Sequence, residues 1–210
     1  MFTGLVTTVG RIASVVPLGS QASHGKRVRL QVDPAWLLGV QLGESIAVSG
    51  ACMTVVELAP DAFAFDISAE SLARTTGLDQ PDELVNLEQS VSLATKLGGH
   101  LVTGHVDGVG RVARFEPIGE SWLLEVDAPA ALGKFFAYKG SIVVNGVSLT
   151  VNRVEDLPGL CRVSINLIPH TLQHTNLHRL HQGSEVNLEI DLIARYVERM
   201  LGAKEETQHV

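Results

Sequence analysis

The sequence of 210 residues is poor in several features, and each shortage narrows what the chain can be. It holds only two cysteines, too few for the disulfide framework of a small secreted domain. No apolar stretch approaches the roughly 20 residues that a membrane-spanning helix needs, so we expect no membrane association. The 16 lysines and arginines are scattered and outnumbered by 23 acidic residues, which argues against nucleic acid as a partner.

Motifs that bind common cofactors are also missing. There is no glycine-rich phosphate loop, no GxSxG elbow and no Rossmann fingerprint. His100 and His105 have no neighbouring cysteine or carboxylate at a metal-ligand spacing, so we expect neither a cofactor nor a bound metal. The residues after Met1 lack the basic lead and apolar core of a secretory signal, which predicts free thiols and a cytoplasmic location.

What the sequence does have is an internal repeat. The segment Leu101–Val106 (LVTGHV) repeats Met1–Val6 (MFTGLV). Further matching blocks follow in the same order: Ser45–Gly50 with Ser141–Gly146, Thr54–Val55 with Thr150–Val151, Glu70–Leu72 with His170–Leu172, Thr76–Leu78 with Thr175–Leu177, and Val85–Glu88 with Val186–Glu189. Two copies are too few for a solenoid, so each copy is expected to form a closed domain.

Each copy contains many short segments in which polar and apolar residues alternate, separated by glycine-rich turns. Arg27–Val32 is typical of these segments. This pattern predicts an all-β chain of two similar, small, antiparallel Greek-key barrels, because closure removes exposed sheet edges. The expected domains are residues 1–97 and 98–190. Residues 1–16 are expected to form the first strand, and Asp33-Pro34 to start a short helix.

The tail from residue 191 to residue 210 has a helical pattern instead. Apolar residues recur every fourth position in two stripes, Leu192, Tyr196, Met200 and Ile193, Val197, Leu201. Asp191 can cap the start of this helix and Gly202 can end it, leaving residues 203–210 unstructured. Two arrangements stay open: the helix packs on its own barrel, or it pairs with copies of itself.

Polar residues recur at matching places in both copies: Thr3 and Thr103, Thr54 and Thr150, Ser71 and Thr171. Turn and strand-end chemistry explains any one of them, but recurrence of the whole set favours two related pockets. Such pockets would offer hydroxyls and backbone amides to an uncharged heterocycle with a polyol arm. Cys52, whose counterpart is Ser148, is either a buried structural thiol or a lining group and weak nucleophile.

With the repeat in view, several segments make the chain resemble the riboflavin synthase family of the alpha-chain type over nearly its full length. These segments are Met1–Gly4, Gly98–His100, Gly104–Gly108, Lys139–Ser141, Asn145–Val151 and Leu167–Thr171. The resemblance implies a cofactor-free dismutation of two 6,7-dimethyl-8-ribityllumazine molecules. One molecule gives a four-carbon unit to the other, which yields riboflavin and 5-amino-6-ribitylaminouracil.

The resemblance also implies an assembly and a set of site residues. It implies a homotrimer joined through the C-terminal helices, with each reaction site between the N-terminal barrel of one subunit and the C-terminal barrel of another. Association with a lumazine synthase is left open. His105 is the expected proton-transfer residue, with Ser45 and Cys52 as supporting polar groups and Phe2 helping to close the site.

The implied pockets are grouped by barrel. The N-terminal pocket would use Gly4, Leu5, Val6, Cys52, Met53, Thr54, Asp66, Ile67, Ser68, Ala69, Glu70 and Ser71. The C-terminal pocket would use Gly104, His105, Val106, Ser148, Leu149, Thr150, Ile168, Pro169, His170, Thr171, Leu172 and Gln173. His100 is a further expected substrate-binding residue. Lys139 would reach a ligand held by a neighbouring subunit.

Two positions depart from the family pattern, and two other functions stay open. Asn145 and His170 stand where some members carry Asp and Glu, and an amide at residue 145 cannot act as a general base. The first alternative function is a non-catalytic lumazine- or flavin-binding protein of the same fold. The second is a metal-dependent enzyme that uses the histidines between His170 and His181.

Overall fold

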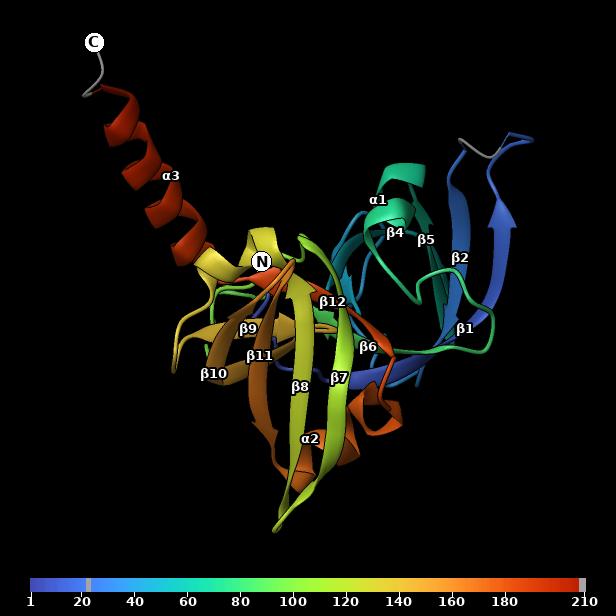
Figure 1. The fold of residues 1–210 in the computed structure, drawn as a ribbon. Helices are drawn as coiled ribbons and strands as arrows, with labels where there is room; N and C mark the ends of the chain where they lie inside the picture. Colours follow the sequence, from blue (N-terminus) through green and yellow to red (C-terminus); the bar gives the residue numbers. More distant parts are fainter. Residues whose placement is uncertain (22–23, 208–210) are drawn as a thin grey trace.

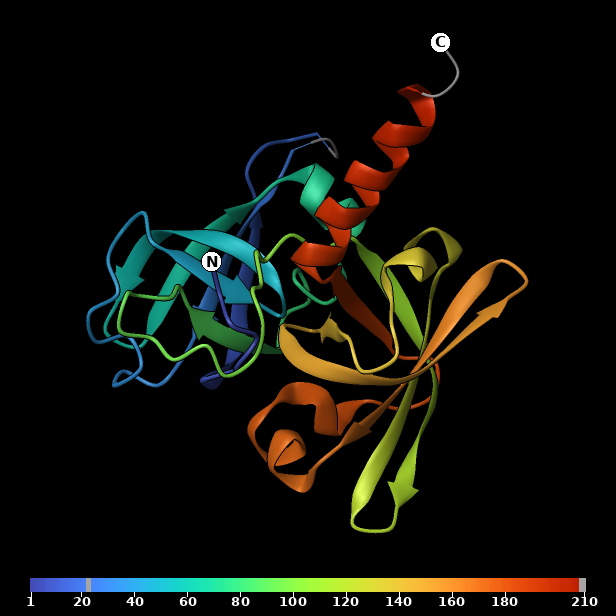
Figure 2. The same ribbon diagram turned by 90° about the vertical axis from the view of Figure 1, so that its left-hand side faces the viewer.

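The computed structural model describes residues 1–21 and 24–207 and contains two closed antiparallel barrels followed by a helix (Figures 1 and 2). This confirms the all-β fold with tandem repeats and a C-terminal helix. Within the described ranges, no helix has the length and apolar character needed to cross a membrane.

The N-terminal barrel is built from strands β1 to β6. Around the barrel the strands lie in the order β1 (Thr8–Pro17), β2 (Lys26–Gln31), β5 (Ala62–Ile67), β4 (Ala51–Ala59), β3 (Ser45–Val48) and β6 (Leu84–Gln89), and β6 pairs again with β1. A bulge between Ile12 and Ser14 bends β1, and another between Val55 and Glu57 bends β4.

The C-terminal barrel repeats this topology strand for strand. Its order is β7 (Gly108–Ile118), β8 (Ser121–Pro129), β11 (Leu160–Leu167), β10 (Val147–Leu157), β9 (Ser141–Val144) and β12 (Glu185–Ile190), and β12 pairs again with β7. Its bulges, between Val112 and Arg114 and between Val151 and Arg153, lie at the equivalent places. The repeat in the sequence is therefore a repeat of the whole folding unit.

Short helices follow the same strand in each barrel. After β5 comes α1 (Ala69–Arg74), where the Ser68 hydroxyl accepts the Ser71 amide at 3.0 Å. After β11 comes α2 (Pro169–His174), which has proline in its first turn. Two 3₁₀ helices are confined to the second barrel: η1 (Ala130–Phe135) and η2 (Asn176–Arg179).

The prediction of a short helix starting at Asp33-Pro34 is wrong. Residues 34–39 form consecutive turns, in which the Trp36 amide donates to the Asp33 carbonyl and the Leu37 amide to the Pro34 carbonyl. Gly39 then takes a φ of +89°, which stops the segment from winding further.

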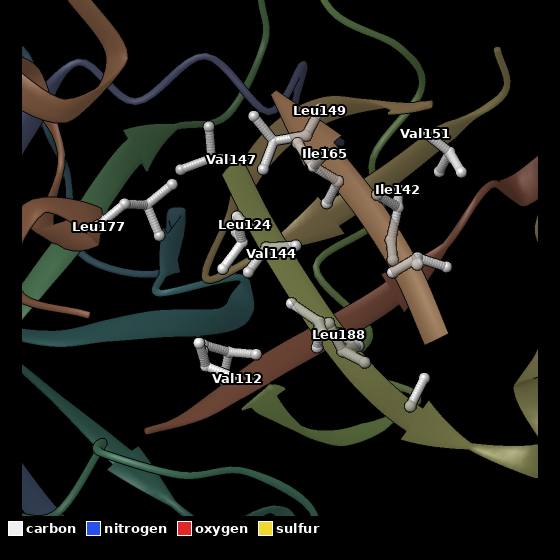
Figure 3. Close-up of a cluster of buried hydrophobic side chains, with 14 of the residues drawn as sticks. Val112, Leu124, Ile142, Val144, Val147, Leu149, Val151, Ile165, Leu177 and Leu188 are labelled. Carbon is white, nitrogen blue, oxygen red and sulfur yellow. The ribbon is translucent and has the colours of Figure 1, made fainter. Parts of the chain in front are cut away.

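Each barrel encloses its own apolar core, as the alternation along its strands requires. In the C-terminal barrel, side chains from several strands converge on Val144 and Leu188 (Figure 3). The N-terminal core includes Phe63 and Phe65, which are fully buried. A third, small cluster lies between the barrels and contains Phe2, Ala47, Val102 and Val143.

The first residues of each repeat contact both barrels. Residues 1–16 were expected to form one strand, but β1 begins only at Thr8. Phe2 and Val102 instead pair with each other, through N–H···O bonds of 2.8 and 3.1 Å. We call residues 1–7 and 101–107 the leading segments. Each leading segment bonds to its own barrel through Thr3 or Thr103 and to the opposite barrel through the carbonyl of Gly4 or Gly104.

Asparagines and glycines join the barrels at their closest approach. The Asn86 side-chain amide donates to the carbonyl of Asn145 at 2.8 Å, and the Asn187 side-chain amide donates to the carbonyl of Ser49 at 3.1 Å. Gly50 has φ +89°, and a Cβ added there would lie 2.9 Å from the backbone nitrogen of Gly146. The two corners can therefore touch only as bare backbone.

The C-terminal helix α3 (Leu192–Thr207) projects from the C-terminal barrel, which its first half contacts through the Arg195–Asp107 and Glu198–Lys134 ion pairs (Figures 1 and 2). The Asp191 carboxylate accepts the Ile193 amide at 2.8 Å, so the expected cap is present. Ile193, Tyr196 and Met200 are 63%, 63% and 68% exposed, so the apolar stripes are not folded back onto the chain's own barrel.

The expected end of α3 at Gly202 is wrong, and so is the expectation that residues 203–207 are unstructured. The helix runs to Thr207, because one glycine costs a helix only about 1 kcal/mol and Gly202 does not adopt the positive φ of a helix cap. Residues 208–210, also expected to be unstructured, lie outside the described residues.

The close approach of the two corners can be tested with alanine. Gly50→Ala should lower the free energy of unfolding by about 1 kcal/mol more than Gly159→Ala, measured by urea denaturation. Both glycines have positive φ, +89° and +81°, but nothing lies within 4 Å of a Cβ at Gly159. Equal losses in the two variants would show that the corners do not need bare backbone.

Candidate functional site

A cavity of about 290 Å³ opens beside the N-terminal barrel, and residues from both repeats line it. The β4 strand contributes Ala51, Cys52 and Met53, the end of α1 contributes Glu70, Ser71, Arg74 and Thr75, and the second leading segment contributes Gly104, His105 and Val106. The Ser49-Gly50 corner, with φ of +41° and +89°, turns the chain so that Cys52 faces this segment.

Contact between Cys52 and the leading segment is tight. The Cys52 amide donates to the Gly104 carbonyl at 2.8 Å, and a Cβ added at Gly104 would lie 2.7 Å from the Cβ of Cys52. Gly104 also has φ +78°, which side-chain-bearing residues rarely adopt. Glycine at residue 104 therefore lets the backbone pass close enough to place His105, which is exposed, at the cavity.

The C-terminal barrel has the equivalent contact with the first leading segment. The Ser148 amide donates to the Gly4 carbonyl at 2.8 Å, and a Cβ added at Gly4, whose φ is +74°, would lie 2.6 Å from the Cβ of Ser148. His100 joins this site, with its Nδ1 atom 2.7 Å from the Ser148 hydroxyl. Farther along the same barrel, Leu172, Gln173 and His178 line a shallow cavity of about 340 Å³.

The leading segments have other neighbours than the grouping by barrel that the resemblance implied. Gly4 contacts Ser148 of the C-terminal barrel, while Gly104, His105 and Val106 lie with Cys52 of the N-terminal barrel. The physical reason is the Phe2–Val102 pairing between the barrels, which directs each leading segment onto the opposite corner.

Comparison with known proteins shows the same duplication. Residues 3–90 and 103–191 each match the lumazine binding domain. The riboflavin synthase of Photobacterium phosphoreum is 37% identical over 202 residues, covering 96% of this chain and 89% of its own. The riboflavin synthases of Mycobacterium bovis and Bacillus subtilis are 38% and 35% identical, covering 96% and 99% of this chain and 98% and 93% of their own.

The chain belongs to the riboflavin synthase family. That family consists of transferase-type enzymes, and its members here match the chain over nearly its full length. Two solved structures also share the fold: LumP complexed with 6,7-dimethyl-8-(1'-D-ribityl) lumazine and LumP complexed with riboflavin. Their TM-scores are 0.78 and 0.79 at 26% and 28% identity, and each comparison covers 90% of this chain and 99% of the other.

Several residues that the riboflavin synthase resemblance suggested lie outside the cavity linings described above. Phe2 is 1% exposed and packs between the barrels against Val102. Ile67 belongs to the N-terminal core, and Asp66 on the same strand pairs with Arg27 at 2.7 Å. The hydrogen bond from Arg27 lowers the pKa of the Asp66 carboxyl. Ser45 lies opposite Thr54 in the β3–β4 register.

The two positions that depart from the riboflavin synthase pattern have different surroundings. Asn145 is nearly buried at the corner, where its side-chain oxygen accepts the Asn187 amide at 2.8 Å. It also lines a separate cavity of about 370 Å³ between the barrels. His170 stacks on His174 with ring centres 4.1 Å apart, where α1 has the Glu70–Arg74 ion pair.

Lys139 and two of the histidines between His170 and His181 make contacts within their own barrel, and the reach of Lys139 to a ligand of a neighbouring subunit stays a prediction. The Lys139 ammonium donates to the Asn152 side chain of its own barrel at 2.9 Å. His174 and His178 each place Nδ1 within 2.8 Å of a backbone carbonyl. In residues 1–21 and 24–207, no group of three or more His, Cys, Asp or Glu side chains is arranged to hold a metal.

Sequence analysis missed the two buried carboxylates Glu88 and Glu189. They are 6% and 2% exposed, and burial raises the pKa of each carboxyl above its ordinary value of 4.5. The signal was present, since an acidic residue ends the apolar blocks Val85–Glu88 and Val186–Glu189 in both repeats. Arg74 and Thr75, which line the N-terminal cavity, were also missed.

Direct contact with Ser148 makes His100 a second candidate for proton transfer beside His105. Burial lowers the pKa of His100 below its ordinary value of 6.5, and the charge of Asp191 opposes that shift. His100 is therefore neutral near pH 7, with Nδ1 engaged by the Ser148 hydroxyl. A neutral imidazole beside a hydroxyl can relay a proton to or from a bound molecule.

The lowered pKa of His100 predicts a pH-dependent stability. The unfolded chain binds this proton at about pH 6.5 and the folded protein only at lower pH, so stability is lost as pH falls below about 6.5. Urea unfolding at about pH 7.5 and about pH 5.5 should show a smaller loss in His100→Gln than in the unsubstituted protein. The control variant His181→Gln, at an exposed position, should lose as much stability between the two pH values as the unsubstituted protein. If the His100→Gln variant lost as much stability between the two pH values as the unsubstituted protein, His100 would not be the group with the lowered pKa.

Proposed function

We propose that this protein catalyses the dismutation of two 6,7-dimethyl-8-ribityllumazine molecules to riboflavin and 5-amino-6-ribitylaminouracil. The observation that carries the proposal is the pair of equivalent sites, at Cys52 and at Ser148, each closed by a leading segment from the other repeat. A reaction between two identical molecules calls for two similar binding sites. Family membership supports the same conclusion.

The proposed reaction requires the protein mainly to position the two lumazines and to transfer protons. The donor loses a proton from its C7 methyl group, and the resulting charge spreads into the ring, while the acceptor takes a nucleophile at C7. Holding the two flat rings face to face orients the reacting atoms, and in model reactions such orientation gives effective molarities of up to about 10⁵–10⁸ M. His105 at the Cys52 site and the His100–Ser148 pair at the other site supply acid–base groups.

We also propose that the chain acts as a homotrimer, with the reacting sites contributed by neighbouring subunits. The apolar stripes of α3 support this, because an exposed apolar face on a helix that projects from its own barrel suits pairing with other copies. A cytoplasmic location agrees with Cys52 and Cys161, which form no disulfide in the part of the chain that the structure describes.

Turnover of the lumazine tests the proposed activity. Purified protein mixed with 6,7-dimethyl-8-ribityllumazine alone should form one riboflavin for every two lumazines consumed, followed by absorbance and chromatography. His105→Gln should lower kcat by about 10²-fold, the size of a lost acid–base group, whereas the exposed His181→Gln should leave it unchanged. Tight binding without turnover would instead favour a lumazine- or flavin-binding protein, the kind of complex described for LumP.

The role of α3 can be tested without deleting it. The double substitution Tyr196→Glu and Met200→Glu should convert the trimer to monomers in sedimentation velocity and lower activity with it. Both side chains are more than half exposed in the single chain, so barrel stability should not change. Arg199→Glu, a charge change at another exposed position of α3, serves as the control. An unchanged sedimentation coefficient in the double variant would rule out α3 as the assembly element.

A further inference from the structure

Two buried carboxylates hold the leading segments in place. Glu88, on β6 of the N-terminal barrel, accepts the Thr3 amide and the Thr3 hydroxyl on one oxygen, both at 2.7 Å. Its other oxygen accepts the Gly4 amide at 2.9 Å. Hydrogen bonds to an ionised carboxylate are stronger than those between neutral groups, so three of them fix this turn of backbone firmly.

Glu189, on β12 of the C-terminal barrel, repeats the arrangement. One carboxylate oxygen accepts the Thr103 amide and hydroxyl, both at 2.7 Å, and the other accepts the Gly104 amide at 3.0 Å. The same three donors therefore meet the same acceptor in both repeats. This recurrence argues against a chance contact of either side chain.

The backbone that each carboxylate holds forms part of the opposite site. Gly4, held by Glu88, gives its carbonyl to the Ser148 amide of the C-terminal barrel at 2.8 Å. Gly104, held by Glu189, gives its carbonyl to the Cys52 amide of the N-terminal barrel at 2.8 Å and continues into His105. Each carboxylate thus lies in one barrel and reaches the site of the other through a glycine.

We infer that Glu88 and Glu189 are crossed positioning residues: Glu88 shapes the ligand site at Ser148, and Glu189 shapes the ligand site at Cys52. The inference rests on the proposed function, because it takes these sites to be the places where lumazines and flavins bind. Its consequence is that a change inside one barrel alters the affinity of the other barrel's site.

Glutamine is the substitution that tests this most directly. It keeps one oxygen for the threonine amide and hydroxyl, but it places an NH₂ group against the glycine amide, so two donors face each other. The glycine turn is then expected to move away. Riboflavin, the proposed product, is a suitable probe because it binds without being consumed.

Amide signals in ¹H–¹⁵N NMR spectra of the full chain separate the two sites during a riboflavin titration. Glu189→Gln should weaken binding reported by Cys52 and His105 by about tenfold, which is about 1.4 kcal/mol, while binding reported by Ser148 and Leu5 changes less than about twofold. Glu88→Gln should give the reverse. Loss at the site in the same barrel, or equal loss at both sites, would overturn the inference.

Milder variants and a stability control separate the crossed effect from a general loss of folding. Thr103→Val and Thr3→Val each remove one hydroxyl bond to the carboxylate, and should show the same crossed pattern with a smaller effect. Val112→Ala removes core volume from the C-terminal barrel and should leave binding at Cys52 unchanged. If the glutamine variants unfold, the valine variants decide the question, and an uncrossed pattern in them overturns the inference.

Failure of the proposed function can be told apart from failure of the inference. If riboflavin shifts neither set of signals in the unsubstituted protein, the proposed function is wrong. Amide hydrogen exchange then tests the crossed positioning without a ligand. Glu189→Gln should speed exchange of the Cys52 amide more than that of the Ser148 amide, and Glu88→Gln the reverse; equal rates would overturn the inference.

Discussion

The exchange of leading segments between the barrels is the constraint on which the rest of the structure depends. Phe2 pairs with Val102 at the centre, and from there each segment runs onto the corner of the opposite barrel. The two barrels are thus parts of one functional unit, although each has its own core. Neither candidate site exists within a single repeat, since each needs a backbone carbonyl from the other.

Close approach of backbone makes this exchange possible. Gly4 and Gly104 lie against Ser148 and Cys52 where a side chain would collide, and Gly50 meets Gly146 at the point where the corners touch. Asparagine side chains then satisfy the carbonyls that the corners bury, as Asn86 does for Asn145 and Asn187 for Ser49. The interface between the barrels therefore combines specific polar contacts at the two corners with a small apolar cluster around Phe2.

The two repeats have kept their scaffold and diverged at their sites. Strand order and bulges agree throughout, and so do the buried carboxylates. The differences lie where a ligand would be met: Cys52 corresponds to Ser148, and the Glu70–Arg74 ion pair of α1 corresponds to the stacked His170 and His174 of α2. Two similar sites with different acid–base groups suit a reaction in which identical molecules take unlike roles, one losing a proton and the other accepting a nucleophile.

The sequence by itself determined the features that rest on local pattern. Alternation of polar and apolar residues predicted the strands, and the matched blocks predicted two equivalent barrels. Apolar residues at every fourth position after Asp191 predicted α3. The patterns that give strands and helices depend on residues close together in the chain. Only the tertiary structure decided that Gly4 serves the Ser148 site and Gly104 the Cys52 site, and that Glu88 and Glu189 hold them. These contacts join residues 52 to 144 positions apart in the chain, and no local periodicity encodes which of them meet.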